Sequence, residues 1–164
     1  MKRFEEHERR HTAIHEAGHV VVARVLGIPC DRVTIVADED SAGHGPIPDP
    51  YAILDVWWEG RGKYHRTFES ALRARVLAFM AGREAEEEIL GSCHDGDGAD
   101  RYQVALMLDS LVRDAEVVRV AARFRRTTRT LVQRHRAAIG RVAALLIRHG
   151  TLDAATIEGV LGTQ

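Results

Sequence analysis

A His-Glu-x-x-His pattern stands near the start of the 164-residue chain, at His15, Glu16 and His19. On an α-helix, residues four positions apart share a face, so the two imidazoles can bind one metal ion together. The glutamate lies one position round the helix and can take a proton from a water molecule on that ion. With a third protein ligand, this is the donor set of a catalytic zinc site. The pattern predicts zinc-dependent hydrolysis with Glu16 as the general base.

A second copy of the pattern, His7-Glu8-Arg9-Arg10-His11, lies directly upstream. A catalytic zinc ion needs packed surroundings that orient its ligands. Apolar residues surround the inner copy, whereas charged residues flank the outer one. We therefore interpret the outer copy as the solvated entrance to the helix. The alternative for the inner copy is a pair of core histidines beside a surface glutamate, since buried histidines must find partners in any case.

The third ligand is sought in the segment 91–100, a glycine-rich turn that carries several metal-binding side chains. A helix is expected after it, over Tyr102–Val112, and a carboxylate at a helix start is well placed to reach a metal ion. Asp100 fits this position best and Asp97 second. The alternative is that Asp100 only caps the helix.

The elements that must position these residues follow from the pattern of apolar residues and breakers. The histidine-bearing helix is expected from about residue 11 to residue 26, because Gly27 and Pro29 are typical of a helix end. Gly18 inside this helix predicts that a neighbouring element crosses closely there. Alternating β-branched residues predict a strand over 31–37.

A long helix is expected from Thr67 to Leu90, with an apolar stripe at three- and four-residue spacing. The acidic run near its end is typical of a solvated face. Glu86 and Glu87 in that run are also candidates for partners of the metal ligands. A less favoured alternative is that one of them is the third ligand itself.

Three candidates between these elements are set aside. His44 lies in a Gly- and Pro-rich stretch and is interpreted as a surface residue. Trp57 and Trp58 are interpreted as core or interface residues rather than as a platform for nucleic-acid bases. The segment 60–63 is not a phosphate loop, because Trp57 and Tyr64 occupy positions that require Gly and Ser or Thr.

Composition predicts one self-sufficient domain, since a chain of this length can bury about 70% of its unfolded surface. It contains no apolar run long enough for a membrane span and no apolar core of a signal peptide. Its two cysteines, Cys30 and Cys93, do not make a disulfide framework, so reduced thiols are expected. We expect a cytoplasmic protein.

Charge is distributed unevenly along the chain. Residues 1–100 carry 12 Lys and Arg against 19 Asp and Glu, whereas residues 101–164 carry 11 against 5. The halves are therefore −7 and +6. The arginines of the second half suggest a competing function, a module that binds a protein partner or nucleic acid with zinc merely structural or absent. Against this competing function, structural zinc sites are usually closed by four Cys or His ligands and need no glutamate beside a histidine, and arginines on helices commonly shield apolar faces. We therefore favour hydrolysis, and nucleic acid is not an expected partner.

The order of the motifs resembles the peptidase domain of the FtsH-type (M41) AAA metalloproteases. The matching pieces are residues 12–19, 33–36, 81–87 and 98–100, with further likeness in the helices at 131–136 and 145–146 and in residues 151, 152 and 157. The resemblance implies a mainly α (α+β), zincin-like helical metallopeptidase domain with a small β element. It would occupy residues 11–164, after a charged N-terminal tail at 1–10.

By the same resemblance, His15 and His19 bind Zn²⁺, Glu16 is the base and an aspartate completes the ligand set. Asp100 is followed by Arg101, where the family has an apolar residue. The expected function is cleavage of peptides or unfolded proteins. The family's ATPase module and membrane anchor are not found in these 164 residues, so we expect ATP-independent cleavage, with a separate ATPase or unfoldase as a possible partner. The ring-shaped oligomer of the family is not assumed.

Overall fold

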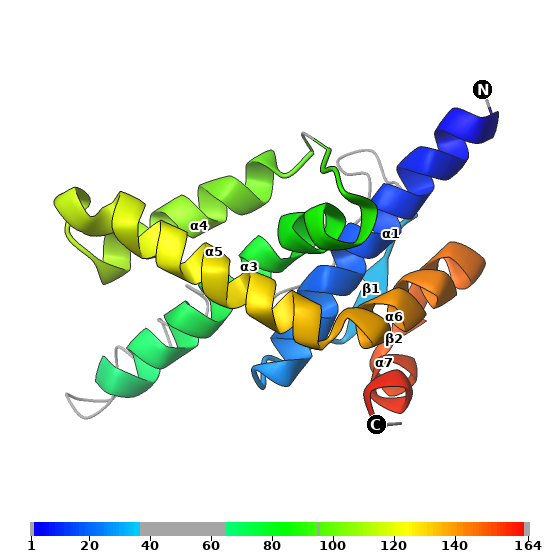
Figure 1. Ribbon diagram of the computed structural model, residues 1–164. Helices are drawn as coiled ribbons and strands as arrows, with labels where there is room; N and C mark the ends of the chain where they lie inside the picture. Colours follow the sequence, from blue (N-terminus) through cyan, green and yellow to red (C-terminus); the bar gives the residue numbers. More distant parts are fainter. Residues whose placement is uncertain (1, 37–64, 95, 163–164) are drawn as a thin grey trace.

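The computed structural model describes residues 2–36, 65–94 and 96–162, and it is mainly helical with one two-stranded sheet (Figure 1). In chain order the elements are α1 (Lys2–Val25), β1 (Arg32–Thr34), α3 (His65–Leu90), α4 (Gly98–Leu111), the 3₁₀ helix η1 (Asp114–Glu116), α5 (Val117–Arg134), α6 (Arg136–His149), β2 (Thr151–Asp153) and α7 (Ala154–Leu161). The predicted fold class, mainly α with a small β element, is confirmed.

Helix α1 is the central element and packs against both α3 and α6 (Figure 1). Its middle turns are buried on nearly every side, which matches their apolar composition. A Cβ atom added at Gly18 would lie 2.6 Å from the carbonyl oxygen of Ala81 and 2.7 Å from the Cβ of Ala85. The predicted close crossing at Gly18 is therefore confirmed, and the crossing element is α3.

Helix α1 ends close to the expected residue but begins much earlier than expected. At its C-terminal end the helix stops at Val25, and Gly27 adopts a positive φ of 78°, as a glycine after a helix often does. At its N-terminal end the helix begins at Lys2 rather than at about residue 11, so the charged residues before residue 11 are helical as well. Tertiary contacts hold these turns: the Arg9 guanidinium donates a hydrogen bond to the carbonyl of Ile147 in α6.

The β element is shorter than predicted and pairs with a strand that the sequence did not reveal. β1 covers Arg32–Thr34 and runs antiparallel to β2, with Val33 opposite Leu152. The hydroxyls of Thr34 and Thr151 are hydrogen bonded at 2.8 Å. Gly150 precedes β2 with a positive φ of 77°, which allows the chain to turn back after α6. The sheet ties residues near position 33 to the C-terminal part of the chain.

Helix α5 carries most of the arginines of the basic half, and it packs against the acidic end of α3. Arg125 and Arg129 both pair with the buried carboxylate of Glu84, and Arg129 also reaches Glu87. The opposite charges of the two halves of the chain thus meet where α5 packs on α3, between partly exposed arginines and the buried Glu84. These ion pairs account for part of the basic character that suggested a nucleic-acid partner.

Two further observations bear on the predictions. Helix α4 begins at Gly98, four residues before the expected start, so the two aspartates that compete as third ligand lie at its N-terminus rather than ahead of it. His44, the two tryptophans and the segment 60–63 lie outside the described residues. In the described part of the chain, no helix is long and apolar enough to cross a membrane.

Candidate metal centre

Three side chains from two helices bring one ligand atom each to a common point. His15 and His19 come from successive turns of α1, and Asp100 comes from the first turn of α4. The two histidine Nε2 atoms lie 2.9 Å apart, and the Oδ2 of Asp100 lies 3.0 Å from the first and 3.2 Å from the second. Ligand atoms around a tetrahedral zinc ion are separated by about 3.3 Å, given bonds of about 2.0–2.1 Å. The spacing fits such an ion closely.

The ring orientations show which nitrogen of each histidine faces the common point. The Nδ1 of His19 donates to the carbonyl oxygen of Ala78 at 2.8 Å, and the Nδ1 of His15 donates to a carboxylate oxygen of Glu86 at 2.6 Å. Carbonyl and carboxylate oxygens only accept, so each Nδ1 carries the hydrogen and each neutral ring presents a bare Nε2. When both rings are neutral, these two nitrogens and the carboxylate of Asp100 therefore converge as three acceptors, without a hydrogen between them. A cation is the group that such a cluster requires.

The electrostatics of the cluster point the same way. Burial lowers the pKa of His15, but hydrogen bonds to Asp100 and Glu86 outweigh it and raise that pKa to about 10. Burial also acts against the charged form of His19, yet the charge of Asp100 raises its pKa. Burial disfavours the charged carboxylate of Asp100, but the two histidines hold its pKa well below the usual range. The site therefore favours a positive charge, which either a proton or a metal ion can supply.

Space at the site depends on Gly82 of α3. A Cβ atom at this position would lie 2.5 Å from the Nε2 of His19 and 2.7 Å from the Nε2 of His15. Both distances are far below van der Waals contact, which is about 3.5 Å or more. The absent side chain leaves the two ligand nitrogens room against the backbone of α3.

The predicted base, Glu16, is buried on α1 beside the two histidines, with 6% of its surface exposed. Its negative charge contributes to raising the pKa of both rings. Glu86, one of the candidate partners of the metal ligands, accepts the hydrogen bond from Nδ1 of His15. Glu87 instead pairs with Arg83 and with an arginine of α5.

The competing aspartate, Asp97, does not join the histidines. Its buried carboxylate pairs with Arg83 at 3.0 Å and with Arg101 at 3.3 Å. These contacts connect the end of α3 to the start of α4, so Asp97 fixes the helix that carries Asp100. Arg101, which stands where the family has an apolar residue, forms an ion pair with Asp97 here.

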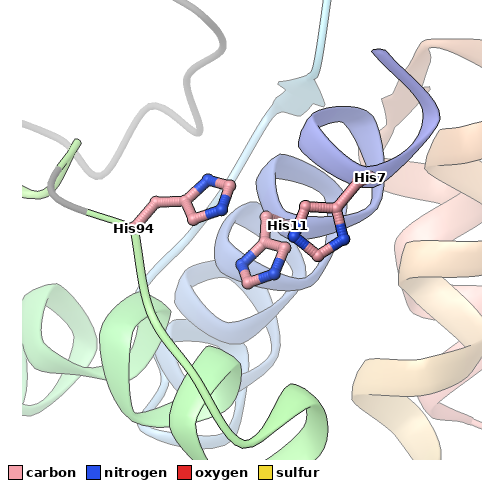
Figure 2. A group of neighbouring side chains, drawn as sticks. All are labelled: His7, His11 and His94. Atoms are coloured by element: carbon pink, nitrogen blue, oxygen red, sulfur yellow. The ribbon is translucent and has the colours of Figure 1, made fainter. Parts of the chain in front are cut away.

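The outer copy of the histidine pattern was only partly anticipated. His7 is exposed, as expected, but His11 has just 2% of its surface exposed and binds the second carboxylate oxygen of Glu86 at 2.8 Å. The interpretation of this copy as a solvated entrance is thus wrong for His11. The reason is that the segment after α3, with His94, covers this face of α1 (Figure 2). The i, i+4 spacing of His7 and His11 was the signal available in the sequence.

Comparison with known proteins shows the family to which this chain is similar. No family model matches the chain. Among curated proteins, the ATP-dependent zinc metalloprotease FtsH 2 of Sphaerobacter thermophilus is 36% identical over 115 residues, which are 68% of this chain and 16% of that protein. The ATP-dependent zinc metalloproteases FtsH of Mesomycoplasma conjunctivae and Protochlamydia amoebophila are 36% and 31% identical over 57% and 66% of this chain, and over 11% of each relative. The chain carries an FtsH-type (M41) peptidase region.

The FtsH-type region corresponds to a small share of those relatives, 11 to 16% of their length. The relatives are zinc metalloproteases by name, and the cluster of two histidine nitrogens and one carboxylate oxygen is of the kind that zinc binds. The predicted family resemblance is therefore confirmed.

Proposed function

We propose that this FtsH-type region binds one zinc ion through His15, His19 and Asp100 and hydrolyses peptide bonds. The observation that carries the proposal is the convergence of three hydrogen-bond acceptors within 3.2 Å of one another, with both histidine rings held by acceptors at Nδ1. The fourth position of such a site is open to water or substrate, which is the arrangement of catalytic rather than structural zinc.

Each residue has a separate task in the proposed reaction. A bound zinc ion would supply Lewis-acid activation of water and of the substrate carbonyl. Glu16 accepts the proton that the attacking water loses and returns it to the leaving amine. Glu86 and the carbonyl of Ala78 hold the rings of His15 and His19 in the tautomer that keeps Nε2 free for the ion.

A pocket beside the metal ligands offers space for a substrate side chain. It has a volume of about 140 Å³ and lies between α3, α4 and α5, with Asp100 in its wall. Phe79, Met80 and Val104 give it apolar surface, whereas Arg83 and Arg101 lie at its polar side. An extended peptide with an apolar side chain next to the cleaved bond fits these surroundings.

We propose peptides and unfolded proteins as substrates, without a need for ATP in the reaction of these 164 residues. A peptide bond must be exposed and extended before water can attack it, whereas folded domains are typically stable by about 5–15 kcal/mol. The sequence has no phosphate loop that would couple ATP to unfolding. Folded proteins would then be cleaved only if a separate ATPase unfolds them.

The decisive variant is Glu16→Gln, which keeps the size of the side chain and removes the base. We expect zinc content equal to that of the wild type and a loss of peptide cleavage by at least about 100-fold, the usual contribution of a general base. A fluorogenic peptide library and metal analysis of the same samples measure both quantities. The library is tested with and without ATP, and the rate should not respond to ATP.

Equal cleavage by the wild type and the Glu16→Gln variant would refute the role of this base. Zinc bound by the wild type without cleavage of any peptide or unfolded protein would favour the alternative, a zinc-containing binding module. The ion pairs of Arg125 and Arg129 with Glu84 speak against nucleic acid as its partner, because those arginines are already engaged.

A further inference from the structure

A second group of histidines lies one turn along α1 from the metal centre. His7 and His11 project from successive turns of α1, and His94 approaches them from the segment between α3 and α4 (Figure 2). One ring nitrogen of each residue lies within 4.8 Å of the others. Two histidines at i and i+4 of a helix with a third from another segment are a donor set that transition metals bind.

The partners of these rings resemble those of bound metal ligands. The Nδ1 of His11 donates to Glu86 at 2.8 Å, and the Nδ1 of His94 faces the carboxylate of Glu8 at 3.3 Å. The hydrogen bond of His11 to Glu86 places the hydrogen on Nδ1 and leaves Nε2 as the ligand atom of this ring. A carboxylate behind a histidine orients the ring and makes it a stronger donor to a metal ion. The backbone N–H of His94 also donates to Glu86, at 3.0 Å, so the same carboxylate positions the loop.

The described ion pairs of these rings are with carboxylates, which attract a cation. The carboxylate of Glu86 contacts His11, and the carboxylate of Glu8 contacts His94. Arg9, which lies between the two histidines in the sequence, instead reaches across to the carbonyl of Ile147 on α6. Its guanidinium is thereby drawn toward another helix.

We propose that His7, His11 and His94 form a second binding site for a divalent transition-metal ion of the zinc type, separate from the centre at His15, His19 and Asp100. Three imidazoles suit zinc, nickel, copper and cobalt ions. His7 and His94 are accessible to solvent, so an ion can enter without opening the core. Glu86 joins the two sites, because one of its oxygens holds His15 and the other holds His11.

Metal binding requires one local change. In the structure the rings of His11 and His94 are stacked, with centroids 3.8 Å apart and planes only 5° from parallel. Parallel stacked rings cannot both direct an in-plane lone pair at one ion between them. The ring of His94 must therefore turn about its side-chain bonds, while the buried His11 stays fixed by Glu86. His94 lies outside regular secondary structure, where such a turn leaves the helices in place.

The test is the zinc stoichiometry of the 164-residue chain at equilibrium. Metal-free protein is dialysed against micromolar free zinc, and bound zinc is measured by mass spectrometry. We expect two ions per wild-type chain, and one ion in each of the variants His7→Asn and His94→Asn. His149→Asn, which changes an exposed histidine at the end of α6, is the matched control and should keep two. Circular dichroism confirms that every variant is folded.

The inner site is tested separately with His19→Ala, so that the two proposals can fail independently. If this variant binds one zinc ion, and the double variant with His94→Asn binds none, the second site is supported. This conclusion does not depend on whether the protein cleaves peptides. A single zinc ion in the wild type that is lost in His94→Asn and kept in His19→Ala would support the second site and refute the proposed catalytic one. Zinc contents of His7→Asn and His94→Asn equal to that of the wild type would overturn the second site.

A further measurement separates metal binding from simple packing of the rings. Substituting Glu86→Gln removes the charge behind both His11 and His15, so zinc affinity should fall at both sites, by about 10- to 100-fold each. His7→Asn should weaken only the second site. In the cobalt-loaded wild type, resonances of the His7 and His94 rings should be broadened in the NMR spectrum, and sharp resonances of both rings at saturating cobalt would contradict their role as ligands.

Discussion

Replacing Gly82 by alanine should empty the inner metal site while leaving the fold intact. The new methyl group would lie 2.5 Å from the Nε2 of His19 and 2.7 Å from that of His15. A carbon atom needs about 3.5 Å to such a neighbour, so the rings would have to retreat by about 1 Å. Metal sites tolerate deviations of only about 0.2 Å in their ligand distances. Retreat is also opposed by the Nδ1 hydrogen bonds of both rings.

We therefore expect the Gly82→Ala variant to lose at least about 100-fold in zinc affinity, the upper end of what the loss of a partner behind a ligand costs. Affinity is measured by competition with a chromogenic chelator. Stability of the metal-free protein gives a second reading. Alanine is favoured over glycine inside a helix by about 1 kcal/mol, so any drop in stability equals the cost of the clash minus this gain.

Gly140 provides the matched control, because it lies inside α6 and a Cβ atom there would meet nothing within 4 Å. The Gly140→Ala variant should bind zinc like the wild type and should be more stable, by up to about 1 kcal/mol. Wild-type zinc affinity in Gly82→Ala would refute the argument that the absent side chain makes room for the ion.

The remaining predictions concern the third ligand and the response to pH. Asp100→Ala should abolish zinc binding at the inner site. Asp97→Ala should retain that zinc and should lose about 2 kcal/mol of stability, because its ion pair with Arg83 is removed. Metal analysis and urea unfolding measure both quantities, and zinc loss in Asp97→Ala with zinc retained in Asp100→Ala would identify Asp97 as the third ligand. Since the pKa of His15 is raised from 6.5 to about 10, its proton stabilises the metal-free fold fully below pH 6.5, and this stability should decline as pH rises toward 10. In saturating zinc the decline should disappear, because the ion has replaced the proton; unfolding curves of metal-free protein that do not change between pH 6.5 and 9.5 would contradict this reasoning.

The parts of the fold that depend on local pattern could be predicted from the sequence. The inner turns of α1 are apolar and are followed by Gly27, so their helical state and end were accessible. Gly18 pointed to a crossing because a glycine is unfavourable in a helix without such a reason. Asp100 was recognisable as the better third-ligand candidate because it stood closest to the expected start of a helix.

The rest depends on contacts between residues far apart in the chain. The burial of His11 follows from Glu86 and the segment with His94, 75 and 83 positions further on, and no local property of His11 indicates it. Strand β2 has only three residues, too few to show an alternating pattern, and forms because β1 lies beside it. The turns of α1 before residue 11 are charged like a tail, yet contacts with α6 and with the segment after α3 hold them as a helix.

The distance along the chain between the ligands also has a consequence for synthesis. Asp100 follows His19 by 81 residues. At about 5–20 residues per second, a ribosome needs about 4 to 16 seconds to add that length. During this time the two histidines of a growing chain have been synthesised, but the carboxylate of Asp100 has not. The proposed zinc site therefore cannot form until the chain has been synthesised at least as far as Asp100.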